Sequence, residues 1–266
     1  AFIKCVGSDV HIGRVVTFGT DYKEGVVNIV GPGSRVDDMT LIGDVIGLKI
    51  YDCAGAYVSR LQTTGVDVPL WVEDSGDIML NSWSNIGGGG GYHDGNDWVY
   101  MPGALIRNCI MVELTAGHIG GLDGGDGDGV SYPAVLIEDS AQVIIGSAVQ
   151  FEGAFSTPVG VWNSERCRLF YSIDLFGSNF KNVDGLHLAG TTTGTMIQTS
   201  VMRPNTSGTP PHSPRYAIND ESTGGNNHAI GNDFGNPAHY TASPIVNGPI
   251  ILTLPSDPTY GDNFTQ

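Results

Sequence analysis

Basic residues are scarce in this sequence. It has 12 lysine and arginine residues against 28 acidic residues, which gives a formal net charge of −16. A surface of this sign repels the phosphates of nucleic acids and of anionic lipids, so we expect no nucleic-acid partner. No apolar run approaches the roughly 18 residues that a membrane-spanning helix needs, so we expect no membrane insertion either.

Two further features are missing. The first residues, "AFIKCVGSDVHIG" (1–13), lack the basic start and long apolar core of a secretion signal. Because "FIKCV" is typical of a strand, we expect the chain to be a piece of something longer. The four cysteines, Cys5, Cys53, Cys109 and Cys167, form no CxxC pair and are too few for a disulfide scaffold, so we expect free thiols.

Helical periodicity is almost absent, and strand-and-turn chemistry takes its place. Short apolar, β-branched runs recur between Gly, Asn, Asp and Ser, and 39 of the 266 residues are glycine. Segments such as "LKIYDCAGAYVSRL" (48–61) and "AVLIEDSAQVIIGS" (134–147) can be laid over one another. Their common form is an apolar strand, an Asp or Asn, a small residue and a second strand.

The spacing of these repeats predicts the fold. We mark each repeat by the apolar residue two before its Asp or Asn: Ile50, Val72, Ile106, Ile137, Val161, Leu188 and Ile218. The shortest interval, 22 residues, fits one coil of a parallel β-helix, and the longer intervals contain loops. The fold class is therefore all-β, a single parallel β-helix of about eight or nine coils. A β-sandwich is disfavoured because strict hairpin turns are missing.

The recurring Asp or Asn is interpreted as a structural corner. These residue types tolerate the left-handed backbone of a sharp bend and bond to nearby backbone groups. We therefore keep this column out of catalysis: Asp52, Asp74, Asn108, Asp139, Asn163 and Asp220. Cys53 and Cys109 share the next column two coils apart, about 9–10 Å, which is too far for a disulfide.

Three long insertions leave from one corner of the predicted coil. They are residues 87–103, 120–133 and 203–215, and the first two lie on neighbouring coils and should touch. Loops stacked on one edge form walls, and the sheet between them forms a groove. Aromatic rings stack on the faces of sugars while acids and amides bind the hydroxyls, so this groove suits carbohydrate.

The candidate site residues follow from this placement. The predicted substrate-binding residues are Tyr92, His93, Trp98, Tyr100 and Gln150. The predicted catalytic carboxylates are Asp94, Asp97, Glu152 and Asp174, because glycoside hydrolysis uses two carboxyl groups about 5–9.5 Å apart. Trp98 and Tyr100 could equally form a small core that holds the loop. A lyase is disfavoured by the few basic residues, and His118 lies at an inward-leaning position, which favours a structural histidine.

The acidic run "DGGDGDG" (123–129) leaves two interpretations open. Asp123, Asp126 and Asp128 could gather around Ca²⁺ with backbone carbonyls. The run has no bidentate Glu and no nonapeptide repeat, so a solvated acidic loop is favoured and no other cofactor is expected.

Coils with an Asx corner, insertions from one edge and abundant glycine resemble the right-handed β-helix of the pectate-lyase-like superfamily, and most of all phage tailspikes and capsular depolymerases. The resemblance covers residues 2–235. It implies a homotrimer on a virion tail, assembled in the host cytoplasm beside other tail proteins, that binds a bacterial surface polysaccharide. "GHIGG" (117–121) is faintly similar to the Gly-His-Gly of polygalacturonases, but the accompanying acidic motifs are missing.

These expectations leave two functions and two domains. One function is a depolymerase, with hydrolysis favoured over elimination, and the other is a non-catalytic adhesin or structural spike. Residues 1–235 are predicted to form the β-helix. Residues 236–266, where the coil pattern fades, are predicted to cap the last coil or to contact another subunit, because open strand edges must be covered.

Overall fold

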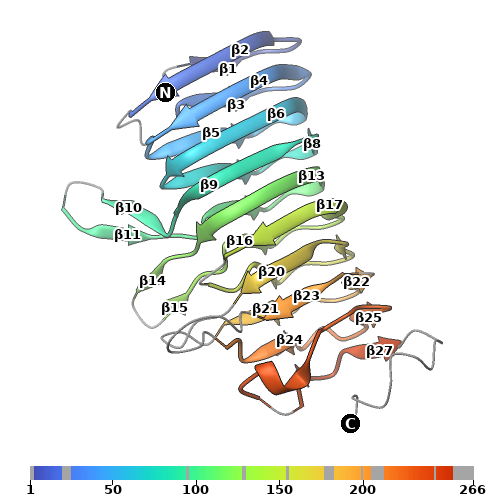
Figure 1. The fold of residues 1–266 in the computed structure, drawn as a ribbon. Coiled ribbons are helices and arrows are strands. Elements are labelled where there is room, and N and C mark those ends of the chain that lie inside the picture. The colour runs from blue at the N-terminus through green and yellow to red at the C-terminus, as the bar shows by residue number, and fades with distance from the viewer. Residues whose placement is uncertain are drawn as a thin grey trace.

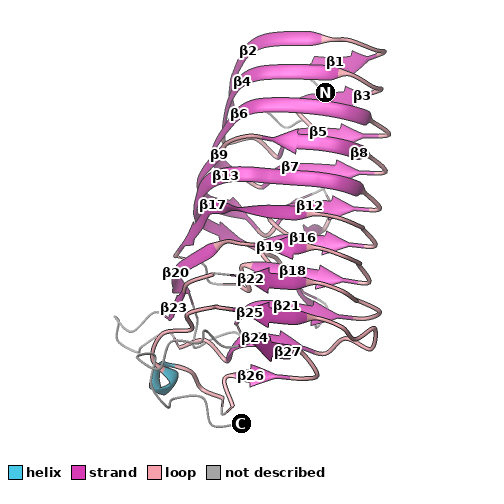
Figure 2. Ribbon diagram, turned by 90° about the vertical axis from the view of Figure 1, so that its right-hand side faces the viewer, coloured by secondary structure: helices cyan, strands magenta, loops and turns pink. Residues whose placement is uncertain are grey.

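The computed structural model describes residues 3–19, 25–93, 96–127, 130–153, 156–176, 183–198, 200–204, 213–242 and 244–253. Two large sheets run the length of the molecule, and the chain passes from one to the other in every coil (Figures 1 and 2). Within each large sheet every strand pair is parallel in the described residues. The prediction of a parallel β-helix is confirmed.

The first sheet has ten strands in the described part of the chain. In spatial order they are β1 (Ile3–Val6), β3 (Val27–Val30), β5 (Ile46–Tyr51), β7 (Val68–Glu73), β12 (Ala104–Arg107), β16 (Val135–Glu138), β18 (Val159–Trp162), β21 (Asp184–Ala189), β24 (Tyr216–Asp220) and β26 (Val246–Asn247).

The second sheet has thirteen strands and bends into two faces. Its main path is β2 (His11–Phe18), β4 (Ser34–Ile42), β6 (Ala54–Val66), β8 (Gly76–Leu80), β13 (Ile110–Asp123), β17 (Ile144–Glu152), β19 (Arg168–Leu169), β22 (Met196–Gln198), β25 (His228–Ile230) and β27 (Ile251–Thr253). The remaining three strands are β9 (Trp83–Gly89), β20 (Ser172–Phe176) and β23 (Met202–Pro204).

We call the two parts of this bent sheet the second and third faces. The second face contains β8, β19, β22, β25 and β27 with the first halves of the long strands, and the third face contains β9, β20 and β23 with their second halves. Two antiparallel hairpins stand outside both sheets, β10 (Gly91–His93) with β11 (Trp98–Tyr100) and β14 (Asp126–Gly127) with β15 (Val130–Ser131). A single 3₁₀ turn, η1, spans Pro237–His239.

The core is a stack of apolar side chains that point inward from all three faces. The markers read from the sequence align as predicted from Ile50 through Val72, Ile106, Ile137 and Val161 to Leu188. All six are buried within the main apolar cluster. The apolar residues of each coil therefore pack against those of the coils above and below it.

The tight corner between the first sheet and the second face is built by left-handed residues. Asp52, Asp74, Asn108, Asp139 and Asn163 all have φ between 47° and 53°, as the sequence predicts. The small residue that follows forms a second ladder: the Ser140 hydroxyl accepts a hydrogen bond from the Cys109 N–H and donates to the Glu138 carbonyl. Ser75 and Ser164 repeat this arrangement.

Asp220 does not belong to this corner column, and its prediction was wrong. Leu186, rather than Leu188, pairs with Ile218, so Asp220 lies two positions earlier in its coil than expected. The side chain points into the protein and is 2% exposed. Its carboxylate accepts hydrogen bonds from the N–H and hydroxyl of Ser222 and from Asn227 Nδ2, which compensate for burial of the charge.

The segment predicted as a tail contributes to the helix. β26 pairs with β24 in the first sheet, and β27 pairs with β25 in the second. The coil therefore continues past residue 235 to at least Thr253. All four cysteines are free and buried, in agreement with the expected thiols. No helix in the described residues is long and apolar enough to cross a membrane.

Candidate functional site

The glycine run 87–91 is the point where the chain leaves the third face. All five glycines have positive φ, between 65° and 116°. A Cβ on Gly88 would lie 2.2 Å from the Val66 carbonyl oxygen, one on Gly89 would lie 2.1 Å from that of Asp123, and one on Gly91 would lie 2.0 Å from that of Val99. Glycine is therefore required both for the backbone conformation and for the close approach of β6, β13 and the hairpin.

The first two insertions touch at their bases, as predicted. The N–H of Gly125 in the second insertion donates to the carbonyl of Met101 in the first at 2.7 Å, and Asp123 pairs with Gly89. Both hairpins leave the same edge of the stack, where β9 and β13 end (Figure 1). The insertions thus form one continuous wall beside the third face.

The second insertion also folds back over the outside of the first sheet. Leu105 and Leu136 are buried although they lie outside the main core cluster. A Cβ on Gly160 would lie 2.6 Å from Pro133, and the Tyr132 and Trp162 rings have centroids 6.0 Å apart. This packing fixes the base of the wall to the rigid stack.

The β10–β11 hairpin carries exposed aromatic rings. Trp98 is 47% exposed and Tyr100 is 39% exposed, and their centroids lie 6.3 Å apart in an edge-to-face arrangement. His93 pairs across the hairpin with Trp98, and Tyr92 pairs with Val99. The two rings support each other but leave much of their surface open to a ligand.

Beside this wall, the third face presents two rows of residues, which are mostly polar from β17 onward. One row runs Ser84–His118–Gln150–Ser172, and the next runs Ile86–Gly120–Glu152–Asp174–Arg203. Glu152 and Asp174 occupy paired positions on neighbouring strands, which places their backbones about 4.8 Å apart. The sequence predicts these two carboxylates on adjacent coils at nearby columns, and the structure places them at paired positions.

His118 joins these carboxylates. Its Nε2 lies 2.8 Å from Oε2 of Glu152, and the two side chains are 52% and 46% exposed. The predicted inward position was wrong, because the alternation of buried residues in β13 shifts by one residue between Leu114 and Ile119, where the strand bends from the second face into the third. Ile119 then takes the core position and His118 faces outward.

A concavity of about 260 Å³ lies directly beside Glu152 and Asp174. It is lined by Gln150, Ser172, Ile173, Asp174, Val201 and Arg203. Arg203 was not among the predicted site residues because it opens the third insertion, where no repeat pattern gives a register. Its cationic group is nonetheless in the same row as Asp174.

The other predicted carboxylates are not part of this row. Asp97 is exposed on the β10–β11 hairpin, which projects sideways from the stack in Figure 1, and Asp94 lies outside the described residues. Of the four predicted catalytic residues, Glu152 and Asp174 therefore lie together on the sheet, Asp97 lies on the hairpin, and Asp94 is outside the described residues.

The predicted Ca²⁺ ligands are only partly described. Asp123 Oδ1 accepts a hydrogen bond from the Gly124 N–H. The backbone of Asp126 lies in β14, and Asp128 falls outside the described residues. Among the side chains that the structure does describe, no group of three His, Cys, Asp or Glu residues is arranged to hold a metal ion.

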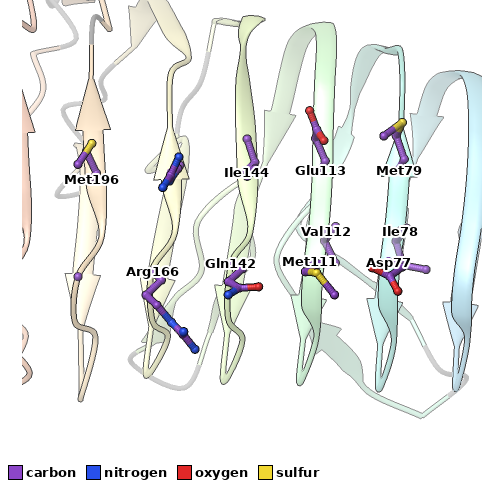
Figure 3. Close-up of a pocket in the computed structure, with 12 residues that line it drawn as sticks. Asp77, Ile78, Met79, Met111, Val112, Glu113, Gln142, Ile144, Arg166 and Met196 are labelled. Carbon is purple, nitrogen blue, oxygen red and sulfur yellow. The ribbon is translucent and has the colours of Figure 1, made fainter.

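A larger hollow, of about 630 Å³, lies on the second face rather than beside the insertions. Two rows of side chains line it (Figure 3). Its lining includes three methionines and two arginines, and it contains none of the residues predicted to bind sugar. The two surfaces are therefore chemically distinct.

Comparisons with known proteins add little to this picture. No protein-family model matches the sequence, and no curated protein sequence matches it. Among solved structures, the A-module of the mannuronan C-5 epimerase AlgE4 of Azotobacter vinelandii is similar over 94% of this chain and 84% of that chain. The TM-score is 0.31 and the sequence identity is 13%, too low to transfer a residue role or a substrate.

Proposed function

We propose that this protein binds an extended bacterial surface polysaccharide along its third face and hydrolyses it beside the two insertions. The single observation that carries the proposal is the row containing Glu152 and Asp174, with His118 bonded to Glu152. Neighbouring strands supply two carboxylates at about the 5–5.5 Å separation that retaining glycosidases use. A stereochemical outcome follows, retention at the anomeric carbon.

Glu152 is the general acid and base of the proposed reaction, and Asp174 is its nucleophile. Glu152 protonates the glycosidic oxygen as the leaving group departs, while a carboxylate oxygen of Asp174 attacks the anomeric carbon and forms a glycosyl ester. Glu152 then removes a proton from water, and the resulting attack releases the sugar and restores Asp174. His118 acts through its hydrogen bond, which orients the Glu152 carboxyl group toward the row.

The surroundings of the pair suit a long polar chain. Gln150, Ser172 and Arg203 line the adjoining hollow and offer hydrogen-bond donors to sugar hydroxyl groups. Trp98 and Tyr100 on the hairpin offer ring faces at the wall. This polar surface extends over several neighbouring strands of the third face. It therefore accommodates several sugar units, which favours a polymer over a monosaccharide as substrate.

The finer identity that we propose is a phage tailspike-like receptor-binding protein, carried on a virion tail. Its support is the combination read from the sequence, namely coils with an Asp or Asn corner, insertions from one edge and abundant glycine. Host glycans of the outer surface are the corresponding substrates.

The test is an assay of the purified chain on bacterial capsule and lipopolysaccharide, with reducing ends and product anomers measured. We expect new reducing ends with retained configuration, and loss of at least 10²-fold of the rate in Glu152→Gln. Product formation that is unchanged in Glu152→Gln would contradict the catalytic assignment, and unsaturated uronate ends would show elimination instead.

The second candidate is a non-catalytic adhesin, favoured by the exposed rings of Trp98 and Tyr100. Ring stacking and hydrogen bonds suffice for retention of a glycan without cleavage. In that case Trp98→Ala weakens glycan binding at least tenfold, while the length of the glycan stays constant with the native protein and with Glu152→Gln alike.

A further inference from the structure

The outer surface of the second face carries one row of side chains with a symmetrical order. Strands β8, β13, β17, β19 and β22 place five paired residues side by side, and in spatial order they are Met79, Glu113, Ile144, Arg168 and Met196. Figure 3 shows Met79, Glu113, Ile144 and Met196 in this line. Read from either end, the row pairs Met with Met and Glu with Arg about a central Ile.

The two charged residues of this row, Glu113 and Arg168, are not paired with each other or with another described residue. Glu113 and Arg168 lie on opposite sides of Ile144, with their backbones two strand spacings or about 9–10 Å apart. In the part of the chain that the structure describes, neither side chain has an ion pair or a hydrogen bond. The neighbouring Arg166, by contrast, is bonded to Glu165.

The same surface is unusually apolar between its charges. Met79 is 40% exposed and Met111 is 45% exposed, and both line the hollow of about 630 Å³. Three of the six methionines of the chain lie on this lining, and flexible thioether side chains are adaptable contact groups at binding surfaces. An exposed apolar strip with fixed charges at two points is typical of an interface.

We propose that this surface binds a second copy of the same chain about a twofold axis parallel to β17. Such an axis reverses the order of the strands in the second copy. Glu113 then faces Arg168 of the second copy, Met79 faces its Met196, and Ile144 meets its own equivalent. A twofold contact is self-complementary in this sense, since residue i contacts j and j contacts i.

The other in-plane axis is disfavoured by charge. An axis along the length of the stack would place Glu113 against Glu113 and Arg168 against Arg168, and like charges across an interface are strongly unfavourable. The reversed arrangement also extends beyond the five residues. The row continues to Tyr57 and Arg35 on one side and to His228 and Ile251 on the other. Tyr57 then faces His228 of the second copy and Arg35 faces its Ile251, so no pair of like charges is created.

The surface is large enough for a reversible dimer. The eight spacings of about 4.8 Å between nine overlapping strands, and a face about five residues wide at 3.3 Å per residue, give a contact of about 600 Å² per copy. The total of about 1,200 Å² is at the lower end of stable interfaces. We therefore expect a concentration-dependent dimer.

Charge exchange tests the proposal, with mass measured by sedimentation equilibrium of the purified chain. Glu113→Arg alone places Arg against Arg, and Arg168→Glu alone places Glu against Glu. We expect each to raise the dimer dissociation constant at least tenfold. An equimolar mixture of the two variants places opposite charges at both contacts, so it is expected to form a heterodimer, and the double variant in one chain is expected to dimerise again.

The controls separate this contact from general charge effects. Lys4→Glu changes the charge at an exposed position of β1 and is expected to leave the dissociation constant unchanged. Circular dichroism checks that each variant is folded. A native chain that stays monomeric at all concentrations, a trimeric mass, or a dimer that both single exchanges leave intact would overturn the proposal.

Discussion

The two corners that flank the first sheet follow opposite rules. At the tight corner, where the chain enters the second face, coil after coil repeats the same left-handed residue and the same bonded small residue. At the opposite corner, where the third face returns to the first sheet, neighbouring coils differ by whole hairpins. The first corner holds the register of the stack, and the second is free to vary because its detours leave the register intact.

This contrast assigns stability to one corner and function to the other. Removing a bonded group at the tight corner should lower the free energy of unfolding and spare the site, and removing a carboxylate from the third face should impair the site and spare the free energy of unfolding. The glycines at the base of the insertions belong with the first group, because the backbone of neighbouring strands passes close to them. The four predictions that follow test this division, beginning with the largest expected effect.

The first prediction compares the loss of a carboxylate on the third face with the loss of a carboxylate at the tight corner, and it separates an effect on glycan cleavage from an effect on stability. Asp174→Asn removes the proposed nucleophile on β20 and is expected to lower the rate of glycan cleavage at least 10³-fold with little change in melting temperature. Asp139→Asn makes the same chemical change at the tight corner, where Asn accepts the left-handed backbone equally well. It should leave cleavage unchanged, and equal losses in both variants would contradict the division.

Two glycines of the same run offer the second test. Gly89→Ala introduces a Cβ 2.1 Å from the Asp123 carbonyl at a φ of 94°, so we expect a loss of about 2–4 kcal/mol in the free energy of unfolding. Gly87→Ala also has positive φ, but its Cβ meets nothing within 4 Å, and the loss should be about 1 kcal/mol. Denaturant titration of both variants measures the difference, and equal losses would show that close approach of β13 is unimportant.

These residues also show how far the sequence reaches. The repeat interval and the Asx corner predict the fold and the alignment from Ile50 to Leu188, because one buried column and one backbone conformation recur in every coil. The same columns predict that Glu152 and Asp174 are neighbours. Local regularity is enough for both.

The failures come from places where local regularity breaks. The shift of alternation in β13 that turns His118 outward occurs where the strand bends between the second and third faces. Asp220 is misplaced because its coil fits a buried Asp–Ser–Asn group where the others have an apolar residue. Arg203 follows an interval of variable length. No periodic pattern encodes these three outcomes.

The hydroxyl ladder of the tight corner gives the third prediction. Ser140→Ala deprives the buried Cys109 N–H of its acceptor, so we expect the free energy of unfolding to fall by about 1–3 kcal/mol while glycan cleavage is unchanged. Ser147 is exposed in the neighbouring part of β17 and supplies the matched control. Ser147→Ala should change the free energy of unfolding by less than about 0.5 kcal/mol.

The last prediction concerns the thiols in and near that corner. Burial raises the pKa of Cys53, Cys109 and Cys167 to about 11 from an ordinary value near 9. The folded state therefore favours the neutral thiol. Its contribution to stability is complete below pH 9 and is lost as pH rises through 11, because the unfolded chain releases these protons first.

Alkaline titration checks this sign directly. The denaturant midpoint should be level between pH 7 and 8.5 and should fall between pH 9 and 11, and Cys167→Ala, which removes one of the three groups, should fall less steeply over the same range. At pH 8 a thiol reagent should react with the unfolded chain and only slowly with the folded one, since the thiolate is the reactive form. Rapid labelling of the folded chain at pH 8 would mean that the tight corner opens, and the division between a fixed corner and a variable one would lose its physical basis.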